Sequence, residues 1–422
     1  MRESIREALS GGFTEAVRDG LWGHIYLTGA LAELTKSAPF LRLHRILQLG
    51  PAYRLYPGAT HTRGAHSLGV CHLARRILLN LAEQGADAWL SPAGARSFLC
   101  AALLHDLGHF PYTHSLKELP LEDHEVLTGK IILREPVKSL VAAAGADPDF
   151  TAAIVNTSLP GDDRELQFYR RLLSGALDPD KLDYLNRDAW YCGIPYGAQD
   201  VDFILSRLHP AEERGADIDS RGIPSVESVL FSKYLMYRTV YWHRQVRSAT
   251  AMVKKALQKS LEQALIAPEE LYDLDDQSLF ALLKDRSQPL FALADQVREG
   301  QLYVLAAEFP FDRALHGDLL DLSRRSLHEN ALAEELSRKL RRTIAPEELI
   351  IDIPEAVSFE TGLYVSDEER YFADSSSAFN AGMVDSLIKS LYIVRIFVDR
   401  KHETGVKSYS DSPQSLLNFI KN

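Results

Sequence analysis

Apolar residues recur at helical spacing through the first two thirds of the chain. In the stretch HSLGVCHLARRILLNLAEQ (residues 66–84) the apolar positions are Leu68, Leu73, Ile77, Leu78 and Leu81. Residues three and four apart share one helix face, so this spacing predicts a helix that Gly85 ends. The stretch ARSFLCAALLHDLGH (residues 95–109) predicts a second, buried helix. It should end at Phe110, because Pro111 disfavours helical backbone in the residue before it.

Two more helices are predicted around residues 180 and 245. Asp178 is a good N-cap, Pro179 a good first-turn residue and Gly193 a good stop, so a helix should run between them. Residues 225–267 contain neither Gly nor Pro, and we predict one long helix with some bends there.

The last third of the chain has a different pattern, in which β-branched and aromatic runs alternate with helical ones. The strand candidates are ELIIDIP (348–354), GLYVSD (362–367) and SLYIVRIFVDRK (390–401), and the helix candidates are LLDLSRRSLHENALAEELSRKL (319–340) and FNAGMVDSLIKSL (379–391). We therefore predict a mainly α protein, with a helical domain over residues 1–275 and a smaller α+β region over residues 276–422. The boundary between them is soft and lies around residues 270–300.

The composition is that of an ordinary globular protein, with 46% hydrophobic and 25% charged residues. The formal net charge is −11, which argues against general nucleic-acid binding because phosphates need basic partners. A small basic pocket that holds one nucleotide is compatible with that charge.

Cysteine use and the N-terminus indicate a cytoplasmic protein. Cys71, Cys100 and Cys192 show no CxxC spacing and are expected to be buried thiols in a reducing compartment. The N-terminal MRESIREALSGG lacks the apolar run of a signal peptide. No uncharged apolar stretch is long enough to span a bilayer, so no membrane contact is expected.

Candidate chemistry lies in three stretches rich in histidine and aspartate. They are HTRGAH (61–66), HDLGH (105–109) and DPDKLDYLNRD (178–188). In the second, His105 and Asp106 are adjacent on the predicted helix and His109 follows one turn later. Imidazole nitrogens and carboxylate oxygens together suit iron, manganese, zinc or magnesium. The alternative is a polar helix C-terminus, where histidine is common because its cation favours the negative end of the helix dipole.

Two of the predicted helices carry polar and aromatic residues on one face. Asp180, Tyr184, Arg187 and Asp188 share a face of the helix that begins after Asp178, and Lys233, Tyr237, Tyr241 and Arg244 form a stripe on the long helix. A solvated face would explain the first set and core packing the tyrosines of the second. On spacing alone a solvated face is the better explanation of the first set, and Tyr184 in the middle of that face, with Lys181 at its edge, weakens that explanation. For the stripe on the long helix, the mixture of tyrosines with Lys and Arg favours a pocket wall over core packing. Lys233 to Tyr241 spans about 12 Å by helix rise, roughly the reach of a nucleotide.

The order His66, His105–Asp106, Asp180 resembles the H…HD…D signature of the HD-domain metal-dependent phosphohydrolases. The strings QLGPAYRLYPGATHTRGAHSLGV, LLHDLGHFPYTHSL, DHE and DPDKLDYLNRDAWYCGI are similar, almost in register, to the deoxynucleoside triphosphate (dNTP) triphosphohydrolases of the sterile-alpha-motif-and-HD type and their bacterial relatives. GLWGHIYL near the N-terminus resembles the opening segment of that group. The resemblance is strong over about residues 20–250.

The resemblance implies roles for individual residues. It makes His66, His105, Asp106 and Asp180 the metal ligands, and His124, His109 and Arg63 the catalytic group. It places Gln48, Leu49, His114, Lys181, Tyr184, Asp188, Lys233 and Tyr241 around the substrate. Two positions depart from the family. Lys233 replaces an arginine, which keeps the charge and loses the bidentate fork. Lys117 replaces an acidic residue that orients the catalytic histidine in the family. In this chain Glu118 or Asp123 could orient that histidine instead.

The activity implied by the resemblance is hydrolysis of a dNTP to deoxynucleoside and triphosphate, with one divalent metal ion per site. The residues do not distinguish Mn, Fe, Zn, Mg and Ni, and a further Mg²⁺ could accompany the triphosphate. The resemblance also implies a homo-oligomer, either dimer or tetramer, and allows a nucleotide effector.

Two alternatives to this activity stay open. One is an HD phosphohydrolase that acts on monophosphates, cyclic dinucleotides or ppGpp, and the other is a nucleotide-binding regulator without turnover. The LGH that follows HD disfavours ppGpp, because synthetase-linked hydrolases continue with an acidic pair.

Overall fold

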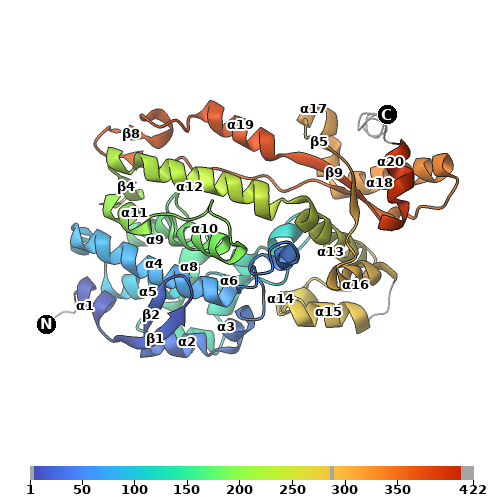
Figure 1. Cartoon of the computed structure of the whole chain (residues 1–422). Coiled ribbons are helices and arrows are strands. Elements are labelled where there is room, and N and C mark those ends of the chain that lie inside the picture. The colour runs from blue at the N-terminus through green and yellow to red at the C-terminus, as the bar shows by residue number, and fades with distance from the viewer. Residues whose placement is uncertain (1–3, 286–288, 410–422) are drawn as a thin grey trace.

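The computed structural model describes residues 4–285 and 289–409. The predicted fold class is confirmed, because the chain is mainly helical and has a few small sheets. Two of these sheets contain strands from the C-terminal region. Helices from the first two thirds form one body, and the C-terminal elements lie along its upper and right-hand sides in Figure 1.

The centre of this body is built from three helices, in which α4 packs against both α5 and α10. The helices of the first 262 residues are α1 (Ile5–Ser10), α2 (Gly29–Thr35), α3 (Ala38–Leu43), α4 (Arg63–Glu83), α5 (Pro92–Leu104), α6 (His124–Ile132), α7 (Val137–Ala143), α8 (Pro148–Val155), α9 (Arg164–Leu173), α10 (Pro179–Cys192), α11 (Val201–Arg207), α12 (Ile223–Met236) and α13 (Arg244–Glu262). The later helices are α14 (Glu269–Tyr272), α15 (Asp276–Asp285), α16 (Ala292–Glu299), α17 (Arg313–His316), α18 (Leu322–Leu340), α19 (Ala381–Leu391) and α20 (Glu403–Tyr409).

The strands form three small sheets. They are the hairpin β1 (Phe13–Asp19) and β2 (Gly23–Thr28), the sheet β3 (Leu208–Ala211), β4 (Gly215–Ile218), β7 (Tyr364–Val365) and β8 (Arg370–Tyr371), and the sheet β5 (Val304–Pro310), β9 (Ile393–Val398) and β6 (Leu349–Asp352), in that order. The parallel pairing of Ile218 with Val365 joins a hairpin of the central region to one of the C-terminal region. The three predicted strands are confirmed as β6, β7 and β9, whereas β1 to β5 and β8 were not predicted.

Most predicted helices are confirmed, together with the residues that begin and end them. The helix expected over residues 66–84 is α4, and Gly85 follows it with a left-handed φ of 104°. α10 begins after Asp178, whose side chain accepts a hydrogen bond from the Lys181 amide, and ends at the left-handed Gly193. The helices predicted over residues 319–340 and 379–391 are α18 and α19.

The helix over residues 95–109 is shorter than predicted. α5 ends at Leu104, and the following residues form a turn instead of a helix that reaches Phe110. The guanidinium of the buried Arg42 donates to the backbone carbonyls of Leu107 and His109. The Thr128 hydroxyl accepts from the Gly108 amide and donates to the His105 carbonyl. Because these backbone groups are bound from outside, they do not continue the helix, and His105 and Asp106 lie in a turn.

The long helix predicted over residues 225–267 is also interrupted. α12 ends at Met236, a π-helical turn covers Tyr237–Tyr241, and α13 begins at Arg244. β-branched and aromatic side chains crowd this stretch, and such turns widen a helix where they occur. One consequence is that Arg244 is exposed and does not continue the predicted stripe.

Three apolar clusters stabilise the fold. The first includes α4, α5, α10 and α12, together with residues 357–391; the second surrounds α13, and the third lies between α18 and the β5–β9–β6 sheet. The first cluster thus contains segments from both sides of residue 275, and the proposed domain boundary stays a prediction. In the described part of the chain the three cysteines are buried and unpaired, as predicted. None of its helices has the length and apolar character needed to cross a membrane.

Candidate active site

All fifteen residues predicted for the site line one cavity of about 750 Å³. They are Gln48, Leu49, Arg63, His66, His105, Asp106, His109, His114, His124, Asp180, Lys181, Tyr184, Asp188, Lys233 and Tyr241. The first turns of α4, α6 and α10, the turn after α5, and the α12–π-turn stretch supply most of them. The structure therefore brings the three separate stretches of sequence together around one space.

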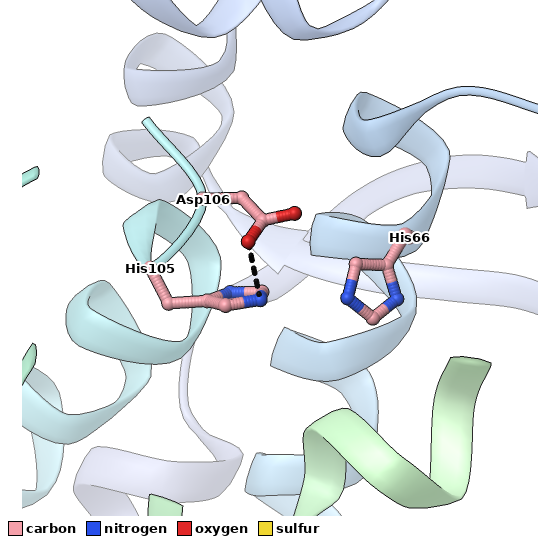
Figure 2. Close-up of side chains that lie close together, drawn as sticks. All are labelled: His66, His105 and Asp106. Atoms are coloured by element: carbon pink, nitrogen blue, oxygen red, sulfur yellow. Dashed lines mark ion pairs between the residues drawn. The ribbon is translucent and has the colours of Figure 1, made fainter. Parts of the chain in front are cut away.

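A His–His–Asp cluster lies on the cavity wall. One ligand atom from each of His66, His105 and Asp106 lies within 4.8 Å of the others. Figure 2 shows His105 and Asp106 facing His66 from a neighbouring segment. The Asp180 Oδ1 atom lies 2.9 Å from His66 Nε2 and 3.8 Å from His105 Nε2. The four predicted metal ligands are thus adjacent.

Hydrogen bonds orient both histidines of this cluster. His66 Nδ1 lies 2.8 Å from the Asp183 carboxylate, and His105 Nδ1 lies 2.9 Å from the backbone carbonyl of Ala102. Both contacts require Nδ1 to carry the proton, so Nε2 is the nitrogen of each ring that faces the cluster and would bind a metal ion. His105 Nε2 is buried and has no hydrogen-bond partner among the described residues. Two such nitrogens beside two carboxylates fit a divalent cation.

The electrostatics of the cluster also suit a cation. Burial would lower the pKa of His66, but the carboxylates of Asp180 and Asp183 outweigh burial and raise it to about 10. Burial would raise the pKa of Asp106, but the neighbouring imidazoles and Arg63 hold it well below its usual range. The carboxylates therefore stay ionised, and the imidazole of His66 binds a positive charge readily.

Three further histidines are stacked beside the cluster. The ring of His109 lies 4.0 Å from that of His124 and 4.7 Å from that of His114, between ring centroids. Burial, the largest effect, lowers the pKa of His124 to about 4. Burial together with Arg63 lowers the pKa of His109 and His114 well below the usual range. All three rings are therefore neutral at neutral pH.

No carboxylate hydrogen-bonds His124 in the part of the chain that the structure describes. Its Nδ1 atom is buried without a partner, and the nearest carboxylate oxygen, from Asp123, is 3.7 Å away. The Glu118 carboxylate is instead bound to Lys254 at 2.5 Å and Arg325 at 2.6 Å. Neither Glu118 nor Asp123 therefore makes the hydrogen bond that would orient His124.

Three cations lie along the cavity next to the cluster. Arg63 donates to Asp106 at 2.8 Å, and its buried Nε makes no hydrogen bond to described residues. Lys181 donates to Asp178 at 2.7 Å, and Lys233 donates at 2.8 Å to Glu360. This concentration of buried positive charge suits an anionic group such as a phosphate.

The other end of the cavity is polar and aromatic. Asp188 accepts a hydrogen bond from the Tyr241 hydroxyl at 2.6 Å, and its second oxygen lies 2.8 Å from His61 Nε2. His61 in turn stacks on Tyr191, with ring centroids 4.7 Å apart. These contacts fix the Asp188 carboxylate, which keeps unused lone pairs for a further donor.

Sequence reasoning missed three residues that support the site. Asp183 orients His66, and its four-residue spacing to Arg187 on the predicted helix could have indicated the buried ion pair that they form. His61 begins the HTRGAH stretch but has no spacing that links it to Asp188. Glu360 lies in a coil, where nothing in the local sequence points to Lys233.

Comparisons with known proteins agree with this geometry. Residues 63–156 match the HD domain, and residues 200–384 match the HD associated region. An uncharacterized protein of Methanocaldococcus jannaschii is 32% identical over 64% of this chain and 55% of its own length. The deoxynucleoside triphosphate triphosphohydrolase SAMHD1 of Gallus gallus is 26% identical over 57% of this chain and 45% of its own length.

A solved structure covers more of the chain. The crystal structure of a hypothetical protein from Aquifex aeolicus superposes with a TM-score of 0.71 at 26% identity, covering 93% of this chain and 99% of that one. By contrast, the chain spans about half the length of the curated relatives it matches.

Proposed function

Because the chain belongs to the HD-domain family and carries the HD-associated region, we propose that it hydrolyses dNTPs to deoxynucleoside and triphosphate. The observation that carries this proposal is the shared cavity. It holds a cluster for a divalent cation, a row of cations and a carboxylate–tyrosine pair along one wall. Asp180 and Asp188 lie two turns apart on α10, about 12 Å along its axis, a distance that suits a nucleotide.

The HD domain implies a divalent metal ion, which His66, His105, Asp106 and Asp180 would hold. When bound, the ion would supply Lewis acidity that polarises a phosphoryl oxygen and acidifies a water molecule. The protein contributes the fixed orientation of the two Nε2 atoms, so that the cluster needs little rearrangement to bind the ion.

The cations next to the cluster would bind the phosphate chain. Arg63, Lys181 and Lys233 would stabilise the negative charge that grows on the phosphoryl oxygens in the transition state. Water oxygen bonds to the α-phosphorus as the bond from phosphorus to the 5′ oxygen breaks. The phosphate chain therefore leaves as intact triphosphate.

His124 would give its proton to the departing 5′ oxygen. In the ligand-free protein burial keeps the pKa of His124 at about 4, so the ring is neutral at neutral pH. Bound phosphate anions favour the protonated ring and would raise that pKa. Protonation of the acid is thereby coupled to substrate binding.

The aromatic end of the cavity would select the sugar. Asp188 would accept a hydrogen bond from the 3′-hydroxyl, and Tyr184 and Tyr241 would crowd the 2′ position. A ribose hydroxyl would then clash or lose its partners, and a site of this kind discriminates strongly.

Product analysis tests the proposal. The purified protein is incubated with manganese and each of the four dNTPs, and the products are separated by ion-exchange chromatography. Deoxynucleoside and triphosphate are expected in equal amounts. Monophosphate with pyrophosphate, or diphosphate with phosphate, would overturn the proposal and leave an HD phosphohydrolase of another specificity.

One observation favours a second candidate, a nucleotide-binding regulator without turnover. Within residues 4–285 and 289–409 no carboxylate hydrogen-bonds His124, and Lys117 lines the same cavity. If no product forms from any dNTP while calorimetry detects tight binding, the regulator is the correct assignment. The expected homo-oligomer is tested separately by light scattering with and without nucleotide.

A further inference from the structure

A coil that we call the strap, residues 353–363, joins β6 to β7 and passes over the cavity. Its apolar side chains, Ile353, Val357, Phe359 and Leu363, are buried. Between them, Glu355, Ser358 and Glu360 line the cavity. The strap is thus anchored in the apolar core while its polar residues face the proposed substrate.

The carboxylate of Glu360 reaches both cavity lysines. One oxygen lies 2.8 Å from Lys233 Nζ and 4.0 Å from Lys181 Nζ, and the other accepts from the Ser358 hydroxyl at 2.9 Å. The Glu360 side chain keeps 32% of its surface exposed, whereas that of Lys233 keeps 6%. Burial would raise the pKa of Glu360, but Lys181 and Lys233 outweigh burial and lower it. The carboxylate is therefore ionised on the lysines.

The two lysines differ in their dependence on Glu360. Lys181 also binds Asp178 at 2.7 Å. For Lys233, Glu360 supplies the only carboxylate within 4.0 Å among the described residues. A buried ammonium needs an anionic partner, and a carboxylate oxygen and a phosphate oxygen require the same N–H donors. Glu360 and a phosphate chain therefore compete for Lys233, because two anions held beside one ammonium repel each other.

We propose that Glu360 is an internal competitor of the phosphate chain: it occupies Lys181 and Lys233 in the free protein, yields them to bound substrate, and reclaims them to displace the triphosphate product. This inference rests on the proposed function. The substrate binds through both its nucleoside and its phosphates, so it outcompetes one carboxylate. After cleavage the triphosphate no longer has the nucleoside contacts, so it binds more weakly than the dNTP and Glu360 displaces it more easily from the lysines.

Isothermal titration of the metal-loaded full chain with inorganic triphosphate tests the inference without turnover. Glu360→Gln should tighten triphosphate binding by at least about tenfold, or ~1.4 kcal/mol, because no charge has to be displaced. The matched control is Glu369→Gln, which removes one charge from an exposed position in the β7–β8 turn. It should leave the affinity unchanged, and deoxynucleoside without phosphate should bind all variants alike.

A second variant guards against misfolding. Glu360→Asp keeps the charge but withdraws the carboxylate by one methylene, so the affinity for triphosphate should lie between those of wild type and Glu360→Gln. Unchanged or weaker triphosphate binding in both Glu360 variants would overturn the inference. Tighter binding in a protein that consumes no dNTP would keep the competition between Glu360 and phosphate groups, and would reject both the triphosphohydrolase activity and the displacement of its product. With turnover present, the product should inhibit Glu360→Gln more strongly than wild type.

Discussion

The two ends of the proposed catalytic region are built in different ways. At the metal cluster, both histidines are held through Nδ1, by Asp183 and by the Ala102 carbonyl, and all parts come from residues 66–183. At the phosphate end, His124 Nδ1 has no partner among the described residues, and Lys233 is held by Glu360 from the distant strap. The protein itself orients the side chains at the metal cluster, whereas we expect the side chains at the phosphate end to take their working contacts only from the substrate.

The largest effect is expected from the metal ligands. Asp106→Ala and Asp180→Ala each remove a charged ligand, so bound metal and activity should both fall to background. Metal content by plasma emission spectrometry and product formation are measured on the same sample. Full metal occupancy in both variants would reject the cluster as the metal site. His66→Ala and His105→Ala should act similarly, although three remaining ligands could retain some metal.

The next largest effect is expected at the substrate-dependent end. His124→Ala should keep the metal and bind substrate, yet lose about 10²–10⁴-fold in turnover, as expected for a positioned general acid. Turnover and metal content are measured together, because a folding defect would lower both. Wild-type turnover in this variant would move the acid role to His109.

A smaller effect is expected from the residue that orients His66. Asp183→Asn weakens the hydrogen bond to Nδ1 and should lower metal affinity by about 10–100-fold. The control is Asp19→Asn, because Asp19 shares the Arg187 partner at 2.8 Å but makes no contact with His66. Competition with a fluorescent chelator gives both affinities. Equal losses in the two variants would mean that the Arg187 ion pairs, rather than the His66 contact, control the site.

The smallest effect is a pH dependence of stability at the cavity wall. Asp276 accepts a hydrogen bond from the Leu47 amide at 2.9 Å, next to Gln48, and burial raises its pKa from 3.8 to about 6. A raised carboxyl pKa means that the folded state binds the proton more tightly, so stability falls as pH rises through this window. Thermal unfolding should show that Asp276→Asn lacks this decline. Parallel wild-type and variant curves between pH 3.8 and 6 would contradict the assignment.

The sequence predicted what depends on local rules and missed what depends on distant contacts. The start and stop of α10 follow from Asp178, Pro179 and Gly193, and all three act within one turn. The end of α5 could not be predicted, because the backbone of His105 and Gly108 is bound by the Thr128 hydroxyl, at least twenty residues later in the chain. The site residues were named from the resemblance, and the structure gathers them in one cavity.

Glu360 is the clearest example of a contact that the sequence could not predict. Its effect depends on reaching Lys233 across 127 residues of sequence, and neither residue carries a spacing that points to the other. The break between α12 and α13 is a similar case. The absence of Gly and Pro predicted continuity, whereas the structure has a π-helical turn in which the Tyr237 ring contacts those of Tyr241 and Trp242.

The central claim is hydrolysis at the α-phosphorus of a deoxynucleotide, and isotope transfer tests it most directly. Matched reactions with dGTP and GTP are run in water enriched in the heavy isotope of oxygen, and the masses of the products are determined by mass spectrometry. The account predicts one heavy oxygen in triphosphate, none in deoxyguanosine, and far slower consumption of GTP. Heavy oxygen in monophosphate, pyrophosphate or phosphate, or equal consumption of both nucleotides, would contradict it.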